Sequence, residues 1–347
     1  MRVLLTGATG LAGCHTAAAV LAKGHRLRLL VRSPEKMARV LRGVGIEKPE
    51  QLDHVIGDVT DAEAVETALE GCEAVIHAAA FFTQDTRREA EVQRTNVLGA
   101  ERVLGAAARR GLDPIVHVSS LAAVFPPDGP VMRPDDRVKQ PRDMYARSKA
   151  AAEQFARRLQ DEGAPVVTVY PGTIIGPEDP TFGDGLRTIM SFVKLGVIPT
   201  TAGGIPFVDV RDLAQLHAAA LEPGRGARRY MLGGSFLSNV ELGAVLQRIT
   251  QRRIRTVYVP PPLIRTIGRI GDQLQRRFGV KPGLTYEAVL ILIHGVPTDD
   301  SRAAEELGVE CRPVDETLRD TLRWMHRERL IEPSKIGVLS NGNATGQ

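Results

Sequence analysis

Short apolar runs alternate with longer segments of helical periodicity along the first half of the chain. This alternation is typical of repeated βαβ units with a parallel sheet. We predict long helices over residues 88–110 and 144–159, which are rich in Ala, Glu, Arg and Leu. The predicted strands cover residues 3–5, 27–31, 54–56, 74–77, 115–118 and 166–170. The pattern predicts an α/β fold with a doubly wound parallel sheet.

The pattern changes after Pro171, where glycine and proline become frequent. We predict a nucleotide-binding core over residues 1–170 and a smaller C-terminal lobe, mainly substrate-binding, over 171–330. Within that lobe, residues 207–222 form a strand and helix that we expect to return to the core. Residues 331–347 are rich in Ser, Asn and Gly without periodicity, so we expect a disordered tail.

Composition narrows the class of protein. The formal charge of +4 on 347 residues does not favour nucleic-acid binding. The three cysteines lie far apart without a CxxC pair, and the eight histidines lack metal-ligand spacing. We therefore expect no metal and a reducing, cytoplasmic setting. No apolar run reaches the 18 residues typical of a transmembrane helix.

A basic segment interrupts this even charge distribution. Residues 248–281 carry nine basic side chains and one acid, Asp272. Within them, residues 263–278 have apolar side chains at helical spacing, with Arg265 and Arg269 off that face. We interpret the segment as a lid over the substrate site. Peripheral contact with an anionic membrane is the alternative.

A glycine-rich loop follows the first predicted strand. The sequence TGATGLAG at residues 6–13 places Gly7, Gly10 and Gly13 before an alanine-rich helix that begins near Thr9 and Leu11. These glycines permit a tight turn and close approach to a pyrophosphate, and the helix N-terminus offers amides and partial positive charge. The loop indicates a Rossmann-type dinucleotide site.

The ends of the next two strands bear on the choice of cofactor. The second strand ends in Arg32, with no acid until Glu35. An arginine at this place accommodates the 2′-phosphate of NADP, whereas an acid would favour NAD. We therefore predict NADP over NAD. Asp58 and Val59 follow the third strand near the expected adenine, although Asp58 can instead cap the next helix.

Tyr145 and Lys149 are four residues apart on a predicted helix, so their side chains share one face. A nearby ammonium favours the phenolate and moves the tyrosine pKa from its usual value of about 10 toward neutral pH. Such a pair suits proton transfer. Ser119 and Ser120 end the fifth strand, where a hydroxyl could bond a reacting oxygen.

These motifs lie within a longer series: GDVTD at 57–61, VIHAAA at 75–80, TNVLGAERVL at 95–104, VHVSS at 116–120, YARSK at 145–149, YPGTIIGPED at 170–179 and FVDVRDLA at 207–214. Over residues 1–327 the chain resembles an extended short-chain dehydrogenase/reductase of the NAD-dependent epimerase/dehydratase superfamily. The resemblance implies that Tyr145 is the general acid/base and that Lys149 binds the nicotinamide ribose and lowers the tyrosine pKa. A serine, Ser120 in preference to Ser119, would polarise a carbonyl. The cofactor would also contact Ala78, Ala79, Ala80, Asn96, Pro171 and Thr173.

Departures from the family pattern bear on the reaction. Dehydratases of the family carry an Asp-Glu pair after the catalytic hydroxyl, where this chain has Leu121 and Ala122. Epimerases commonly place an arginine just before the motif at 207–209, where this chain has Gly-Ile-Pro. Phe81, Phe82, Leu121 and Ala122 are the expected pocket residues, and they favour an apolar or aromatic substrate, although they could equally be core.

The resemblance therefore implies an NADP-dependent oxidoreductase of the dihydroflavonol reductase and hydroxysteroid dehydrogenase-like branch. It would reduce a ketone or aldehyde, or oxidise the matching alcohol, on a small-molecule substrate. A nucleotide-sugar epimerase is one alternative. A non-catalytic NADP-binding regulatory protein is another, against which the intact Tyr145, Lys149 and Ser120 argue. A homodimer is left open.

Overall fold

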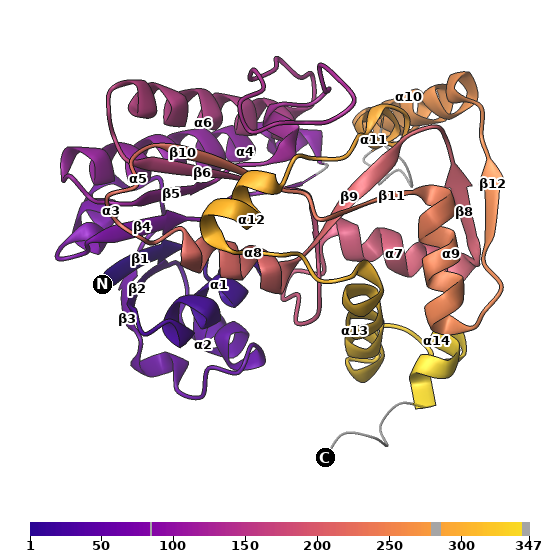
Figure 1. The fold of residues 1–347 in the computed structure, drawn as a ribbon, viewed down its shortest axis with the longest axis horizontal. Coiled ribbons are helices and arrows are strands. Elements are labelled where there is room, and N and C mark those ends of the chain that lie inside the picture. The colour runs from indigo at the N-terminus through magenta and orange to yellow at the C-terminus, as the bar shows by residue number, and fades with distance from the viewer. Residues whose placement is uncertain (84, 279–285, 342–347) are drawn as a thin grey trace.

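A seven-stranded, wholly parallel sheet forms the centre of the computed structural model, which describes residues 1–83, 85–278 and 286–341 (Figure 1). The six strands predicted from the sequence lie within six of its strands. In spatial order the sheet contains β10 (Arg228–Leu232), β6 (Val166–Pro171), β5 (Ile115–Val118), β4 (Ala74–His77), β1 (Arg2–Thr6), β2 (Arg26–Val31) and β3 (Asp53–Ile56).

Helices cover both faces of this sheet, because alternate residues of each strand point to opposite sides. In β1, Val3 and Leu5 pack into one apolar layer while Leu4 packs into the other. The first layer includes residues of α1 (Leu11–Ala22), α2 (Pro34–Gly43) and α8 (Val210–Ala219). The second includes residues of α3 (Ala62–Leu69), α5 (Gly99–Arg109) and α6 (Met144–Asp161). The predicted doubly wound fold is confirmed.

The long helix expected over 88–110 is interrupted. It consists of a 3₁₀ turn (Thr86–Arg88), α4 (Glu89–Gln93), a π-helical segment (Arg94–Leu98) and α5. Single-turn π segments are frequent at functional sites. Here the segment carries Asn96 and buries its side chain. Helix α6 agrees with the helix expected over 144–159 and extends it by two residues.

A smaller lobe lies beside the sheet and is built on its own core (Figure 1). It contains a three-stranded sheet of β7 (Thr173–Ile175), β9 (Gly204–Asp209) and β11 (Ser235–Ser238), and a two-stranded sheet of β8 (Val197–Thr200) and β12 (Arg255–Tyr258). Around them lie α7 (Asp184–Leu195), α9 (Asn239–Thr250) and α13 (Val314–Arg327).

Two strands lie in a different sheet from the one expected. Strand β9, expected to return to the main sheet, instead pairs with β7 and β11, and only the helix after it, α8, packs on the core. Strand β10, expected in the lobe, is the seventh strand of the main sheet and pairs with β6. The sequence of a short apolar strand does not indicate which strand it pairs with. The pairing depends on burial of both faces of the strand, as with Tyr230 and Met231 in β10.

The C-terminal segment is packed where its composition suggested disorder. Residues 331–341 include α14 (Pro333–Ile336) and a 3₁₀ turn (Gly337–Asn341). Ile331, Ile336 and Leu339 are buried in the lobe core against residues such as Trp324. These three buried apolar side chains thus hold an otherwise polar segment against the lobe. Residues 342–347 lie outside the described part.

Two further helices, α10 (Pro261–Phe278) and α11 (Tyr286–His294), pack together at the far end of the lobe (Figure 1). Shorter elements are the 3₁₀ turns at Pro49–Gln51 and Leu121–Ala123 and the helix α12 (Ser301–Leu307). Among the helices in the described ranges, none combines the length and apolar character needed to cross a bilayer.

Candidate active site

The glycine turn between β1 and α1 is closely packed. Gly7 has φ +80°, a conformation that favours glycine, and a Cβ placed on it would lie 2.6 Å from the amide nitrogen of Ala79. A Cβ on Gly13 would lie 2.0 Å from the carbonyl oxygen of Gly7. The chain can make this turn only with glycine at both positions. The close approach that these glycines allow brings the start of α1 against the end of β4.

The first turn of α1 suits an anion. Its N-cap, Gly10, supplies no side-chain hydrogen bond, and the turn contains no acidic residue. Thr9 and Leu11 flank the turn and are partly exposed. The first amides of a helix and the positive end of its dipole form a site for phosphate groups. The cradle therefore fits the pyrophosphate of a dinucleotide.

Arg32 and Asp58 lie at the carboxyl ends of the neighbouring strands β2 and β3. Arg32 is largely exposed, and its Nη1 is 3.6 Å from Oδ2 of Asp58. The other carboxylate oxygen of Asp58 accepts from the backbone N–H and the hydroxyl of Thr60, at 2.9 and 2.8 Å. Burial raises the pKa of Asp58, but these hydrogen bonds and the Arg32 charge outweigh it and leave the pKa lowered. Val59 is buried beside Gly99.

Asn96 fixes the loop that follows β4. Its Nδ2 donates to the carbonyl of Phe81 at 3.0 Å and to the hydroxyl of Ser148 at 2.8 Å, and its Oδ1 accepts from the N–H of Phe81 at 2.7 Å. Ala78 and Ala79 donate from their backbone to Thr6. Ala80 is exposed at the tip of this loop. The amide of Asn96 thus ties the expected cofactor loop to α6.

Helix α6 begins at the tyrosine–lysine pair. Asp143 caps it by accepting from the N–H of Ala146 at 2.9 Å, and Tyr145 and Lys149 occupy its first two turns. Lys149 is buried, and its Nζ donates to the carbonyl of Val118, at the end of β5, at 2.9 Å. Burial lowers the pKa of Lys149 to about 8, against the opposing charge of Glu153. An ammonium of this kind titrates close to neutral pH.

Tyr145 interacts with Ser120. Desolvation raises the pKa of Tyr145 to about 12, and a hydrogen bond with the Ser120 side chain acts in the opposite direction. The expected lowering by Lys149 is not observed, because its ammonium points to the carbonyl of Val118. Ser120 also accepts from the N–H of Ala122 at 3.2 Å. Ser119 is buried, and its hydroxyl has no hydrogen-bond partner among the described residues.

Aromatic side chains border the tyrosine. The ring of Phe82 meets that of Tyr145 edge-on, with centroids 4.8 Å apart, and Phe82 is 49% exposed. Phe81 lies under the guanidinium of Arg88, 4.4 Å from ring centroid to Cζ. Leu121 packs partly into an apolar cluster that includes Ile291 of α11. Of the expected pocket residues, Phe82 is therefore the one whose ring contacts Tyr145.

The chain passes from one sheet to the other beside this site. Pro171 ends β6 in the main sheet, and Thr173 begins β7 in the three-stranded sheet. Between them, a Cβ on Gly172 would lie 2.7 Å from the carbonyl oxygen of Gly233 and 2.8 Å from that of Pro206. Pro171 and Thr173 therefore lie where the two lobes meet.

The structure adds a buried acid that the sequence interpretation missed. Glu153 lies one turn beyond Lys149, is fully buried, and accepts from the hydroxyl of Tyr170 at 2.5 Å and from Nε of Arg157 at 2.9 Å. Its other oxygen is 3.9 Å from Nε2 of His117. Tyr145, Lys149, Glu153 and Arg157 are each four residues apart, a spacing that could have revealed this row.

The strand histidines belong to the core. His77 is buried and its Nδ1 lies 2.8 Å from the hydroxyl of Thr6. The His117 ring stacks on it at 6.2 Å between centroids. Burial lowers the pKa of His77 to about 3 and that of His117 well below its ordinary value. In the described part of the chain no three metal-binding side chains converge.

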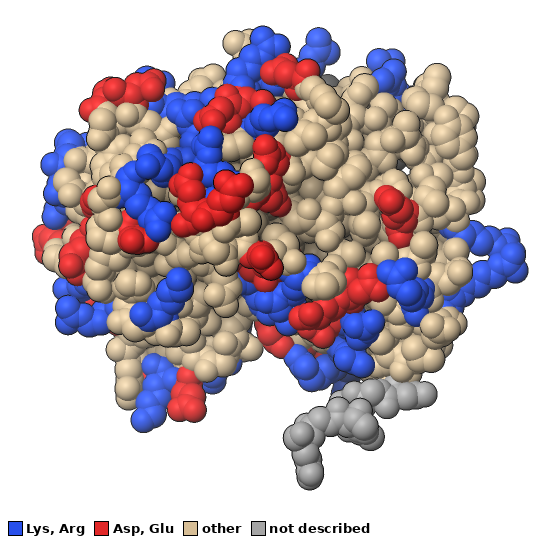
Figure 2. Space-filling model, in the orientation of Figure 1, with Lys and Arg blue, Asp and Glu red and all other residues tan. Residues whose placement is uncertain are grey.

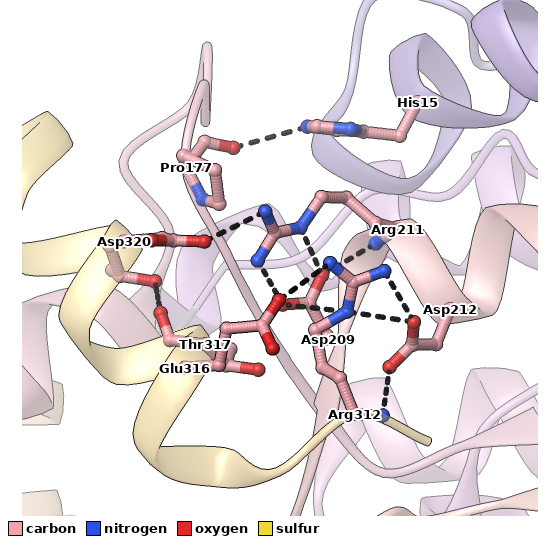
Figure 3. A network of polar contacts seen from close by, with 10 residues as sticks. His15, Pro177, Asp209, Arg211, Asp212, Arg312, Glu316, Thr317 and Asp320 are labelled. Carbon is pink, nitrogen blue, oxygen red and sulfur yellow. Dashed lines mark hydrogen bonds and ion pairs between the residues drawn. The ribbon is translucent and has the colours of Figure 1, made fainter. Parts of the chain in front are cut away.

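A network of ion pairs links α8 of the core to β9 and α13 of the smaller lobe (Figure 3). Arg211, at the start of α8, donates from Nε and Nη2 to the two oxygens of Asp209 at 3.0 and 2.7 Å, and from Nη1 to Asp320 at 2.8 Å. Arg312 pairs with Asp212 at 2.7 Å. The Asp209 side chain is fully buried. Arg211 is therefore paired with Asp209, at the end of β9, and with Asp320 of α13.

A parallel sheet, a glycine cradle at its first helix and a tyrosine–lysine pair beside a serine define a dinucleotide-dependent enzyme of the short-chain dehydrogenase type. Residues 3–233 match the sequence pattern of the NAD dependent epimerase/dehydratase family. The chain belongs to this family.

Curated relatives and solved structures agree with that assignment. The chain is 29% identical over 341 residues to sterol demethylase protein B of Methylococcus capsulatus, covering 95% of this chain and 100% of the relative. It is 29% identical over 335 residues to a 4-hydroxy-2-methyl-3-oxo-4-farnesyl-3,4-dihydroquinoline-1-oxide ketoreductase of Stigmatella aurantiaca, covering 93% and 96%. The crystal structure of gox2253 matches with a TM-score of 0.78 at 27% identity, covering 95% and 99%. The protein is an oxidoreductase that depends on a nicotinamide dinucleotide.

Proposed function

We propose that the protein is an NADPH-dependent reductase of an apolar or aromatic ketone or aldehyde, or catalyses the reverse alcohol oxidation. The observation that carries this proposal is the contact of Tyr145 with Ser120 on one side and with the exposed ring of Phe82 on the other. One side supplies proton-transfer chemistry and the other an apolar surface for the substrate.

The reacting oxygen would lie between Tyr145 and Ser120. Ser120 would donate to it and polarise the carbonyl, while Tyr145 would transfer its proton to it. A tyrosine pKa of about 12 keeps the phenol protonated at neutral pH, as an acid for reduction requires. Lys149 would bind the nicotinamide ribose and supply a positive charge one helical turn from Tyr145. The bound dinucleotide supplies the hydride.

The preference for NADP rests on Arg32. It is exposed at the end of β2 and paired only at 3.6 Å with Asp58, so its remaining donors can reach a 2′-phosphate. Ser33 follows it and caps α2, accepting from the N–H of Lys36 at 3.1 Å. The N-terminus of α2 adds partial positive charge beside the same position.

The preference for an apolar substrate rests on the side chains near the expected pocket. The residues before Phe207 are Gly204, Ile205 and Pro206, which provide no cation for a sugar diphosphate. Arg211, the next arginine along the chain, is held by Asp209 and Asp320. Phe82 instead presents a large apolar surface beside Tyr145.

The free thiols support a reducing setting for the protein. Cys14, Cys72 and Cys311 are all free, and Cys14 and Cys311 have pKa values raised to about 12 by burial. Such thiols are unreactive and unpaired, which fits a reducing compartment such as the cytoplasm.

The proposal is tested by following NADPH oxidation with a panel of flavonoid, steroid, aldehyde and UDP-sugar compounds. We expect turnover with at least one apolar carbonyl compound and none with UDP-sugars. Epimerisation of a UDP-sugar without net NADPH consumption would overturn the proposal in favour of an epimerase. Cofactor binding without turnover of any compound would favour a regulatory NADP-binding protein.

A further inference from the structure

Helix α10 carries an exposed apolar stripe. Leu263, Ile267, Ile270 and Leu274 are 53%, 45%, 51% and 44% exposed. Their spacing of four, three and four residues places them on one face of the helix. Isolated exposed apolar side chains are ordinary, but an aligned row of four marks a surface with a partner.

The helix is held to the lobe by a different face. Ile264 is buried against Val289 and Leu292, and a Cβ on Gly268 would lie 3.0 Å from atoms of Tyr286 and Val289. Ile264 follows Leu263 by one residue, a rotation of about 100° around the helix. Packing on α11 therefore leaves the four side chains of the stripe exposed.

Two arginines of the helix, Arg265 and Arg269, contact residues at the two ends of α11. Arg265 lies 3.2 Å from Nε2 of His294, and the Arg269 guanidinium lies 5.4 Å from the ring centroid of Tyr286. Strand β12 ends just before the helix and adds exposed Val257 and Tyr258 at 49% and 64%. This part of the lobe thus combines aliphatic, aromatic and basic side chains.

Basic side chains outnumber acidic ones around the stripe, where Asp272 is the one acid of α10. Residues 185–208 and 242–271, which include β8, β12 and most of α10, contain no Asp or Glu but eight Lys or Arg, two in the first range and six in the second. Lys194, Arg253, Arg255 and Arg269 are exposed. Figure 2 shows that the end of the molecule where Figure 1 places β8, β12 and α10 is largely uncharged on the face in view, with basic side chains at its edge. This composition complements an anionic bilayer.

We propose that the apolar stripe of α10, with the basic residues around it, docks the protein on the surface of an anionic lipid bilayer. The helix lies in the interface with Leu263, Ile267, Ile270 and Leu274 inserted among the acyl chains, and Tyr258 and the arginines lie at headgroup level. The proposal does not rest on the proposed reaction. A second copy of the chain would bring like charges together at this surface, which disfavours a dimer through it.

The test is sedimentation of the full chain with vesicles of phosphatidylcholine alone or mixed with phosphatidylglycerol. We expect binding to the mixed vesicles and much weaker binding to phosphatidylcholine. The variant I267Q/I270Q should lower the partition coefficient about tenfold or more, because two apolar side chains no longer insert. R253Q/R255Q should lower it about fivefold for each arginine removed and weaken its salt dependence.

The matched control is V240Q/V338Q, which changes two β-branched residues of similar exposure, 51% and 52%, on α9 and the 3₁₀ turn at Gly337–Asn341. It should bind vesicles like the wild type, and thermal unfolding should show that both variants are folded. Equal vesicle binding by I267Q/I270Q and the wild type would overturn the proposal. So would a wild-type protein that ignores vesicles, or one that sediments as a dimer only while the stripe is intact.

Discussion

The hydroxyl of Tyr170 donates to the carboxylate of Glu153 at 2.5 Å, in the interior of the protein and one helical turn from Lys149. Arg157 completes the carboxylate's partners. One oxygen of this buried carboxylate accepts from Tyr170 and Arg157, and the other lies 3.9 Å from Nε2 of His117. The charge of Glu153 raises the pKa of Lys149 against the larger effect of burial.

Glu153→Gln should therefore lower the pKa of Lys149 further. An ammonium whose pKa falls is lost at lower pH, so the alkaline limb of the kcat profile should move to lower pH. The matched control is Glu162→Gln, an exposed acid at the C-cap of α6. Glu153→Gln also leaves Arg157 without its buried partner and should cost about 3 kcal/mol in free energy of unfolding. A pH profile identical to the wild type would show that Glu153 acts on packing alone.

Tyr145→Phe should lower kcat by about 10²–10⁴-fold, because proton transfer is lost while the ring remains against Phe82. NADPH binding, measured by fluorescence titration, should change little. Tyr258→Phe, on the exposed strand β12, is the control and should retain full turnover. Turnover that survives in Tyr145→Phe would remove this tyrosine from the mechanism.

Arg32→Ala should weaken NADPH binding by about 1.5–3 kcal/mol, the value of a hydrogen bond to a charged group, and leave NADH binding nearly unchanged. The control is Arg26→Ala, an exposed arginine at the opposite end of the same strand. Both affinities can be measured by titration calorimetry. An equal loss for NADPH and NADH would refute a contact with the 2′-phosphate.

Arg211→Ala should destabilise the protein by about 3 kcal/mol near neutral pH, because the buried carboxylate of Asp209 loses its two hydrogen bonds from Arg211 and keeps only the more distant Arg312, at 3.6 Å, as a charged partner. Burial raises the pKa of Asp209, but hydrogen bonds from Arg211 outweigh it and lower the pKa below its ordinary value of 3.8. A lowered carboxyl pKa adds stability above pH 3.8 that is lost as the pH falls through the lowered value.

The difference between wild type and Arg211→Ala in denaturant unfolding should therefore shrink in acid. The double variant D209N/R211A should recover part of the loss, since the buried charge that lost its main partner is removed. A deficit that is independent of pH, and that D209N does not relieve, would assign the effect to packing of the Arg211 side chain.

The local features of this site were predictable, and the non-local ones were not. The strands and the glycine loop follow from periodicity and backbone conformation, as with Gly7 and its φ of +80°. The sheet that recruits a strand depends on partners far along the chain, so β9 and β10 were placed wrongly. The interruption at Asn96 arises because its amide reaches both Phe81 and Ser148, a contact that helical propensity does not encode.

Residue spacing along the chain suggested how the pKa values would shift, but burial determines the direction of the shift. The four-residue spacing of Tyr145 and Lys149 predicted a lowered tyrosine pKa, yet desolvation raises it. The amphipathic pattern of 263–278 was recognisable, but which face packs on α11 depends on Gly268 and Ile264. Composition likewise could not show that Ile336 and Leu339 anchor the C-terminal segment.

Gly172 lies where the two lobes meet. Backbone atoms of Gly233 and Pro206 lie within 3 Å of where its Cβ would be, so three chain segments cross at one point with no side chain between them. Pro171 and Thr173 lie on either side of the crossing. A side chain at this position would meet backbone on two sides and push the three segments apart, so the width of the join between the two lobes is set by the absence of a single methyl group.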